Sequence, residues 1–149
     1  MKVAFAADHR GFALKAALLA AARELRYDVV DVGTFDDEPC DYTDYGRRAA
    51  ELVARGDADR AVLVCGTGIG MSILANKVPG IRAALCASEY TARLSRQHND
   101  ANCLALSADQ TAPRLARVIM ELWLTTPFEG GRHAGRLEQL RALERHYLK

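Results

Sequence analysis

A cysteine stands between an apolar run and a glycine-rich segment near the middle of the chain. Residues 62–72 read Val-Leu-Val-Cys-Gly-Thr-Gly-Ile-Gly-Met-Ser, which places Cys65 directly before glycines at alternate positions. Alternate glycines allow positive φ angles and leave several backbone N–H groups facing one concavity that can bind an anion. A helix starting near Gly70 would add the partial positive charge of its N-terminus there. These residues predict a reactive thiol beside a cradle for a phosphate, a carboxylate or an enolate.

Other interpretations of this segment are available from the residues alone. A cysteine that ends a buried strand more often behaves as a small hydrophobic side chain, and the glycine turn is what favours a chemical role here. A dinucleotide fingerprint would need glycines where the chain has Met71 and Ile73. The Gly-Lys-Ser/Thr ending of a nucleotide-binding P-loop is absent too. The segment therefore predicts a cradle for a small anion rather than for a dinucleotide.

Polar side chains follow two other predicted strands. Asp8-His9-Arg10-Gly11 comes after the first strand, and Asp41-Tyr42-Thr43-Asp44 follows the second. Because ligands bind outside the carboxyl ends of parallel strands, these segments should share one sheet edge with Cys65. The segment Ser95-Arg96-Gln97-His98-Asn99-Asp100 instead precedes the last strand and should lie at the opposite edge. It needs a dimer partner or a kinked connection to reach the site.

The last predicted helix carries two arginines four residues apart. Arg132 and Arg136 can share one helix face and grip a phosphate. Gly130-Gly131 just upstream supports that role, because free backbone N–H groups near a helix start bind anions. Arg141 and Arg145 extend the same face, so a solvated basic surface is the simpler interpretation of the spacing alone.

The elements that must position these residues alternate between strand and helix. Strands are predicted at Val3–Ala7, Tyr27–Val32, Ala61–Cys65, Arg82–Cys86 and Cys103–Leu106. Helical apolar spacing covers Phe12–Leu25, Asp44–Ala54, Met71–Lys77, Tyr90–Gln97, Ala112–Leu124 and Ala134–Tyr147. The alternation predicts an α/β fold around a five-stranded parallel sheet. Because no linker, repeat or low-complexity tract interrupts the chain, residues 1–149 are expected to form a single domain.

Composition and charge narrow the classes of function. The 149 residues are 50% apolar and carry 20 basic and 19 acidic side chains, for a formal net charge of +1. That balance offers no broad basic surface to nucleic acid or anionic lipid, so a small-molecule ligand is expected. The longest apolar run, residues 16–22, is too short to span a bilayer, and charged residues interrupt the N-terminus where a signal peptide needs its apolar core. We expect a cytoplasmic protein without nucleic-acid or membrane partners.

The cysteines give no sign of a metal or disulfide framework. All four lie far apart in sequence and no C-x-x-C pair occurs, which excludes the usual zinc and dithiol signatures. Reduced thiols are therefore expected. Cys86 and Cys103 lie in or beside apolar runs and are predicted to be inert core residues.

Several blocks spread along almost the whole chain resemble one family. They are Ala7–Phe12, Asp41-Tyr42, Cys65–Ser72 with Ala75-Asn76-Lys77, Ser95–Asp100, and Glu129–His133 followed by Arg136. Together they are similar to the ribose-5-phosphate isomerase B family, which also contains the allose-6-phosphate and galactose-6-phosphate isomerases. The resemblance implies a Rossmann-like three-layer α/β/α sandwich. It also implies a homodimer or dimer of dimers with shared active sites, in which the C-terminal helix packs on the partner.

The resemblance also implies a reaction and its central residues. The activity is the aldose–ketose isomerisation of ribose 5-phosphate and ribulose 5-phosphate, part of pentose phosphate metabolism, through a cis-enediolate and without a metal or organic cofactor. The cysteine that matches Cys65 is the base that moves a proton between C1 and C2. Backbone N–H groups and a nearby hydroxyl of the turn would hold the enediolate oxygen; these come from Gly66, Thr67, Gly68, Ile69, Gly70 and Ser72.

The same resemblance assigns the outer parts of the site. His98 would open the furanose ring with help from Asp8, and Asn99 would bind sugar hydroxyls. Tyr42 either stacks on the sugar or packs beneath its loop. The phosphate would be met by three side chains, His9, Arg132 and Arg136. The remaining histidines of the C-terminal region, His133 and His146, are predicted to be structural.

Two positions depart from the family pattern. After the last strand the family often has an arginine that can help to bind phosphate, whereas this chain has Asp109. A carboxylate cannot replace a cation. We therefore expect one of two arrangements: either Asp109 points away from the phosphate, or the phosphate pocket relies on His9, Arg132 and Arg136. Thr43 stands where a proline often follows the Asp-Tyr pair, which loosens the loop without removing a functional group.

Two alternative functions remain open at this stage. One keeps the mechanism but takes a hexose 6-phosphate such as allose 6-phosphate. The other is a non-catalytic sugar-phosphate binding module, which only Asp109 favours. Cys65 and His98 count against that module, because a pure binder needs neither a base nor a group that opens the ring.

Overall fold

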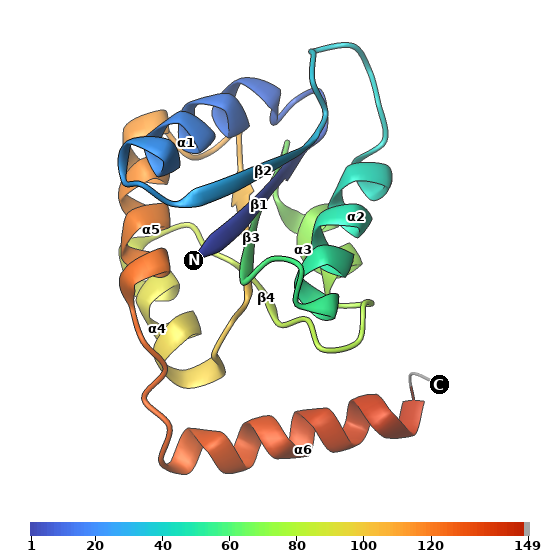
Figure 1. Cartoon of the computed structure of the whole chain (residues 1–149), viewed down its shortest axis with the longest axis vertical. Coiled ribbons are helices and arrows are strands. Elements are labelled where there is room, and N and C mark those ends of the chain that lie inside the picture. The colour runs from blue at the N-terminus through green and yellow to red at the C-terminus, as the bar shows by residue number, and fades with distance from the viewer. Residues whose placement is uncertain (148–149) are drawn as a thin grey trace.

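A five-stranded parallel sheet forms the centre of the molecule, seen in a computed structural model that describes residues 1–147 (Figure 1). The strands are β1 (Lys2–Ala7), β2 (Asp28–Gly33), β3 (Arg60–Cys65), β4 (Ala83–Leu85) and β5 (Cys103–Ser107). Their order across the sheet is β2-β1-β3-β5-β4. The chain therefore reverses its direction of travel across the sheet between β1 and β3, which is where ligands of open α/β sheets bind.

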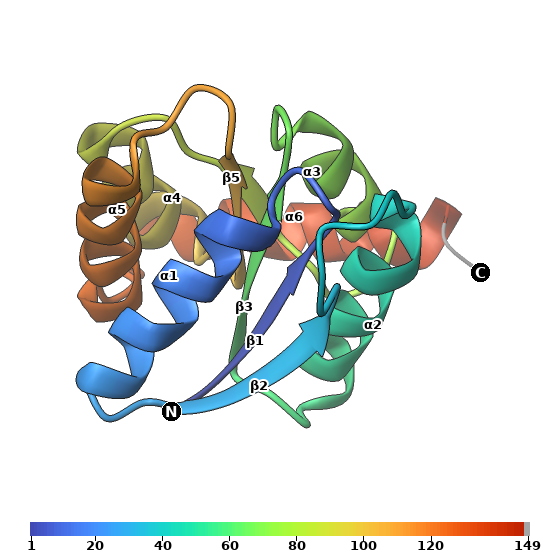
Figure 2. The same cartoon turned by 90° about the horizontal axis from the view of Figure 1, so that it is seen from above.

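Within residues 1–147, five helices cover the two faces of the sheet and a sixth stands outside them, an arrangement that Figure 2 shows from above. One face carries α1 (Phe12–Glu24), α4 (Glu89–Asn99) and α5 (Pro113–Thr125), and the other carries α2 (Tyr42–Arg55) and α3 (Ile69–Ala75). Each interface has its own cluster of buried apolar side chains. The last helix, α6 (Arg132–Tyr147), lies beyond the β4 edge. The predicted three-layer α/β/α sandwich with a parallel sheet is confirmed.

The predicted elements all occur, with shifted ends. Strand β4 is one residue shorter than predicted at each end, and the side-chain amide of Asn76 bonds both backbone groups of Ala83, where the strand starts. Helix α3 was expected at 71–77 but begins at Ile69, directly after a left-handed Gly68. The expected domain of residues 1–149 includes residues 148–149, which lie outside the described residues. None of the helices within 1–147 has the length and apolar character needed to cross a bilayer.

Local capping explains where the helices of the site begin. The Asp41 carboxylate accepts a hydrogen bond from the Thr43 N–H at 3.0 Å and caps α2. This contact orders the loop that Thr43, in place of a proline, was expected to loosen. Ser88 and Thr91 form a reciprocal capping box that starts α4, the helix that ends at Asn99.

The loop after β1 is packed tightly against β3. The Asp8 N–H donates to the Val64 carbonyl at 3.3 Å, and the Asp8 carboxylate accepts from the Gly11 N–H at 2.9 Å. A Cβ atom on Gly11 would lie 2.5 Å from the Val64 carbonyl oxygen, so only glycine fits there. This packing fixes Asp8 next to the strand end that carries Cys65.

Two glycines separate the effect of backbone angle from that of crowding. Gly68 and Gly80 have similar φ angles of 76° and 83°, but a Cβ on Gly68 would lie 2.6 Å from Leu85 Cδ1, whereas a Cβ on Gly80 would meet nothing within 4 Å. We predict that Gly80→Ala lowers the free energy of unfolding by about 1–2 kcal/mol from its backbone angle. Gly68→Ala should cost about 1–3 kcal/mol more, because it also overpacks. Urea unfolding of both variants checks this, and equal losses would contradict it.

Candidate active site

Cys65 ends β3 in a buried position, 4% exposed, at the carboxyl edge of the sheet. The Gly68 N–H donates to its sulfur at 3.2 Å, and the Ile69 N–H donates to Thr67 Oγ1 at 3.2 Å. The turn therefore directs a backbone donor at the thiol, as the alternating glycines predicted. A negative charge on the sulfur would be stabilised by that donor.

The carbonyl groups at the start of the turn are held by the segment after β5. The Ala108 N–H donates to the Cys65 carbonyl at 2.9 Å, and the Asp109 N–H donates to the Gly66 carbonyl at 3.0 Å. The Ser107 hydroxyl donates to the same Gly66 carbonyl at 2.8 Å. These bonds fix the backbone of the turn, so its geometry is set before any ligand arrives.

The loops after β1 and β2 meet beside this turn. They line an open depression of about 470 Å³ with Asp8, His9, Pro39, Cys40, Asp41 and Tyr42. The His9 ring is held through Nδ1, which lies 3.2 Å from both the N and the O of Cys40. The Tyr42 ring packs against α3, since a Cβ on Gly70 would lie 2.8 Å from Tyr42 Cζ. Tyr42 is half-buried and also lines the depression, so the two roles left open for it stay predictions.

A second group of predicted residues lies elsewhere in the chain. His98 is near the end of α4, before β5 begins, and its ring stacks on that of His133 with centroids 4.2 Å apart and planes 12° apart. Glu129 Oε2 lies 3.9 Å from His98 Nε2 and 3.6 Å from His133 Nε2. One ring nitrogen of each histidine and one carboxylate oxygen of Glu129, the atoms that could bind a metal ion, lie within 4.8 Å of one another. Cys65, by contrast, pairs with Ser107 at the far end of β5.

Two arginines fix the end of α4 and thereby His98 and Asn99. The buried Arg96 donates to the carbonyls of Thr126 and Ala101 and to the Asp100 carboxylate. Arg82 donates to the carbonyls of Asn99 and Asp100. The exposed Arg132 and Arg136 belong to the first turns of α6, next to His133.

The predicted site residues therefore form two separate groups within one chain. The carboxyl-edge group brings together Asp8, His9, Tyr42, Cys65, Gly66, Thr67, Gly68, Ile69, Gly70 and Ser72. The far group holds His98, Asn99, Arg132 and Arg136. The sequence placed the His98 block at the opposite edge, and the sheet topology confirms that placement.

The other thiols have different surroundings from Cys65. Burial raises the pKa of Cys103 to about 12. Burial also raises the pKa of Cys86, whose sulfur faces the Ser95 hydroxyl. At neutral pH both are held as neutral thiols, so the prediction that they are core residues is confirmed. All four cysteines are unpaired.

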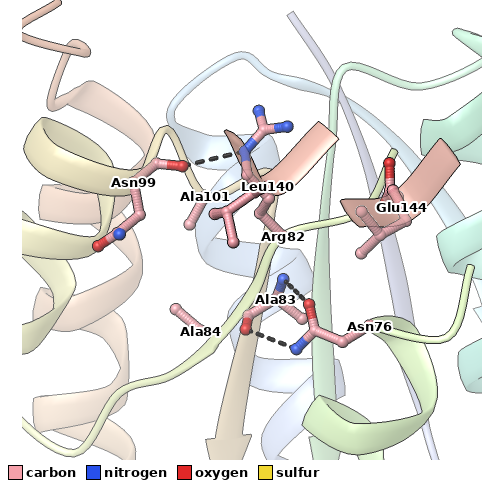
Figure 3. Close-up of a pocket in the computed structure, with 9 residues that line it drawn as sticks. Asn76, Arg82, Ala83, Ala84, Asn99, Ala101, Leu140 and Glu144 are labelled. Carbon is pink, nitrogen blue, oxygen red and sulfur yellow. Dashed lines mark hydrogen bonds between the residues drawn. The ribbon is translucent and has the colours of Figure 1, made fainter. Parts of the chain in front are cut away.

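Another cavity, of about 360 Å³, opens between α6 and the β4 edge (Figure 3). Leu140 and Glu144 of α6 line one side of it, and Arg82, Ala83 and Ala84 line the other. Its walls include none of the residues around Cys65, and Asn99 is the one predicted site residue among them. The cavity is therefore separate from the Cys65 site, and it reflects the loose packing of α6 on the sheet.

Three side chains near the predicted site residues were given no catalytic or binding role in the sequence. Glu129 and His133 pack with His98, and their spacing of four residues beside Arg132 was a signal that could have linked them. Arg10 forms an ion pair with Asp109, a contact across 99 positions for which the sequence offers no local signal.

Comparison with known proteins gives consistent matches. The family model described as Ribose/Galactose Isomerase matches residues 3–140. Ribose-5-phosphate isomerase B of Escherichia coli is 46% identical over 143 residues, which are 96% of each chain. The structure of ribose-5-phosphate isomerase B from Clostridium thermocellum superimposes with a TM-score of 0.97 at 46% identity, over 99% of both chains. That of the Mycoplasma genitalium protein, which has bound ribulose-5-phosphate, gives a TM-score of 0.92 at 38% identity over 97% of this chain and 96% of the other.

The buried His133 predicts a pH dependence of stability. Burial, and then the positive charge of His98, lower the pKa of His133 below its ordinary value of 6.5. The unfolded chain therefore takes up the proton first as the pH falls, so stability is full above about pH 6.5 and declines below it towards the folded-state pKa. We predict a drop in Tm between about pH 7.5 and about pH 5.5 that is smaller in His133→Asn. His146→Asn, which changes an exposed histidine of the same helix, should keep the wild-type slope; equal slopes in all three proteins would contradict the assignment.

Proposed function

The chain belongs to the ribose/galactose isomerase family and is an aldose–ketose isomerase, and we propose that it interconverts ribose 5-phosphate and ribulose 5-phosphate with Cys65 as the base. The observation that carries the assignment of the base is the buried sulfur of Cys65, which accepts the Gly68 N–H inside the glycine turn. The pentose substrate is supported by the ribulose-5-phosphate bound in the Mycoplasma genitalium relative.

The reaction needs one proton to move between neighbouring carbons. Once the sugar is open, the Cys65 thiolate takes a proton from C2 of the aldose and leaves an enediolate. The thiol then returns the proton to C1, while the hydroxyl proton passes from O2 to O1, so the atoms balance. Backbone N–H groups between Gly66 and Gly70 would hold the enediolate oxygen, and the rigid carbonyl contacts of the turn support that role because a preformed donor set need not reorganise.

Ring opening and phosphate binding would use the far group. We assign His98 to proton transfer at the furanose ring, with Asp8 assisting, and Asn99 to the sugar hydroxyls. The stack on His133 and the nearby Glu129 would hold the His98 ring in one orientation. The phosphate would lie between His9 and the arginines of α6, Arg132 and Arg136.

These assignments require two copies of the chain. The two groups belong to opposite edges of one sheet, so we propose a homodimer, or a dimer of such dimers, in which each site takes its far group from the second copy. Exposed apolar side chains support this arrangement. They lie beside the Cys65 turn at Ile69 and Ile73, on the edge strand at Leu85, and on α6 at Leu140 and Leu143. Pairing would bury this surface and explain why α6 makes so few contacts with its own sheet.

We place the protein in the cytoplasm as one sugar-phosphate isomerase domain. Its four unpaired cysteines suit a reducing compartment. The family model matches residues 3–140, a range that holds nearly all of the five-stranded sheet, which supports a single catalytic unit.

Replacing the base tests the proposed chemistry. We predict that Cys65→Ala lowers kcat for ribose 5-phosphate by about a thousandfold, in the range expected when a general base is lost. Cys86→Ala, which removes a buried thiol outside the site, should keep kcat within about threefold. Coupled assays of ribose 5-phosphate and allose 6-phosphate should give the higher kcat/KM for the pentose. Turnover that survives in folded Cys65→Ala would remove Cys65 from the mechanism, and faster hexose turnover would correct the substrate.

A further inference from the structure

The guanidinium of Arg10 lies flat against the glycine turn. A Cβ on Gly66 would lie 3.0 Å from each of three of its atoms, Cζ, Nε and Nη1, so the plane of the group faces the backbone next to Cys65. Its remaining nitrogen, Nη2, donates to Asp109 Oδ2 at 2.5 Å. Arg10 is thus part of the carboxyl-edge group.

Asp109 is held in place by the same turn. Its backbone N–H donates to the Gly66 carbonyl, which also accepts the Ser107 hydroxyl. The carboxylate therefore cannot drift far from Gly66, and it fixes the orientation of the guanidinium above that residue. The Asp109 carboxylate thus lies at the turn and pairs with a cation, while the two alternatives given for it in the sequence stay predictions.

Stability does not account for this ion pair. The side chains of Arg10 and Asp109 are 57% and 38% exposed. Exposed pairs of this kind add little to folding. An exposed arginine that is nevertheless oriented by a fixed carboxylate is suited to meet a ligand from solvent.

We propose that Arg10 binds the phosphate of the sugar-phosphate substrate and that Asp109 is its positioning residue; this inference rests on the proposed function. A guanidinium has five N–H donors in a planar fork, and the single bond to Asp109 leaves donors on the other edge for phosphate oxygens. Arg10 also directly follows His9, the residue of this loop already assigned to the phosphate. The carboxylate at position 109 would then act through Arg10 instead of opposing the substrate alone.

The proposal predicts that Asp109→Asn changes KM in opposite directions in the presence and in the absence of Arg10. When Arg10 is present, the carboxylate orients the guanidinium, so Asp109→Asn should raise KM for ribose 5-phosphate severalfold. When Arg10 is absent, the carboxylate only repels phosphate. Asp109→Asn should then lower KM in the Arg10→Ala background. If the pair is purely structural, Asp109→Asn should leave KM nearly unchanged in both backgrounds.

The experiment compares wild type, Arg10→Ala, Arg10→Lys, Asp109→Asn and the double variant Arg10→Ala/Asp109→Asn. Arg10→Ala should raise KM by about ten- to a hundredfold, the worth of one charge-assisted contact, with kcat within about threefold. Arg10→Lys should give an intermediate KM, because an ammonium cannot form the bidentate fork. Arg23→Ala removes an exposed arginine in the last turn of α1 and should leave KM unchanged.

Binding of inorganic phosphate tests the role of Arg10 independently of the proposed isomerase activity. Its Kd, measured by calorimetry on the folded proteins, should rise in Arg10→Ala by a factor similar to that of KM. An unchanged Kd and KM would overturn the assignment of Arg10. A fall in kcat with an unchanged phosphate Kd would also overturn it and would place Arg10 at the reacting carbons. If wild type turns over neither sugar, the proposed function fails, while the phosphate comparison still decides the role of Arg10.

Discussion

The Val64 carbonyl is the point on which the site depends. It accepts the Asp8 N–H, and it leaves no room for a side chain at Gly11, so the first loop is pressed onto the third strand. Because β1 and β3 are neighbours where the strand order reverses, this contact places the Asp8 carboxylate beside the strand end that carries Cys65. The next residues of the same loop then lie at this edge, with His9 held by Cys40 and Arg10 placed against Gly66 of the glycine turn. Under the proposed roles, a looser loop would separate Cys65 from the side chains assigned to the sugar phosphate, Asp8 and His9.

The buried cysteines of this chain have two kinds of surroundings, which depend on where each cysteine lies in its strand or loop. Cys103 and Cys86 lie among apolar side chains, where burial raises the pKa of each thiol and keeps it neutral. Cys65 is nearly as buried, but it ends its strand at a turn whose Gly68 N–H points at the sulfur. What distinguishes Cys65 from these two thiols is its position at the end of β3, where the glycine turn begins.

The sequence predicted the sheet, the helices and the carboxyl-edge group because those depend on local patterns. Apolar periodicity located the elements, and glycine spacing located the turn at Cys65. The Arg10–Asp109 pair and the stack of His98 on His133 escaped prediction, since they join positions that only tertiary packing brings together. Lys15 is a similar case: it reads as an ordinary helix residue, yet it is 1% exposed and donates to the Thr34 carbonyl at 2.6 Å under the loop after β2. Such contacts follow from how helices cross the sheet, which residue patterns do not specify.

The central claim is that each active site combines the Cys65 group of one copy with the His98 group of another. Mixing two inactive variants, Cys65→Ala and His98→Asn, under conditions that let subunits exchange tests it directly. Half of the mixed dimers would be hybrids, and each hybrid would hold one intact site, so turnover of ribose 5-phosphate should recover to about a quarter of the wild-type value. If exchange occurs and the mixture stays as inactive as its components, each site is built within a single chain and the account is wrong.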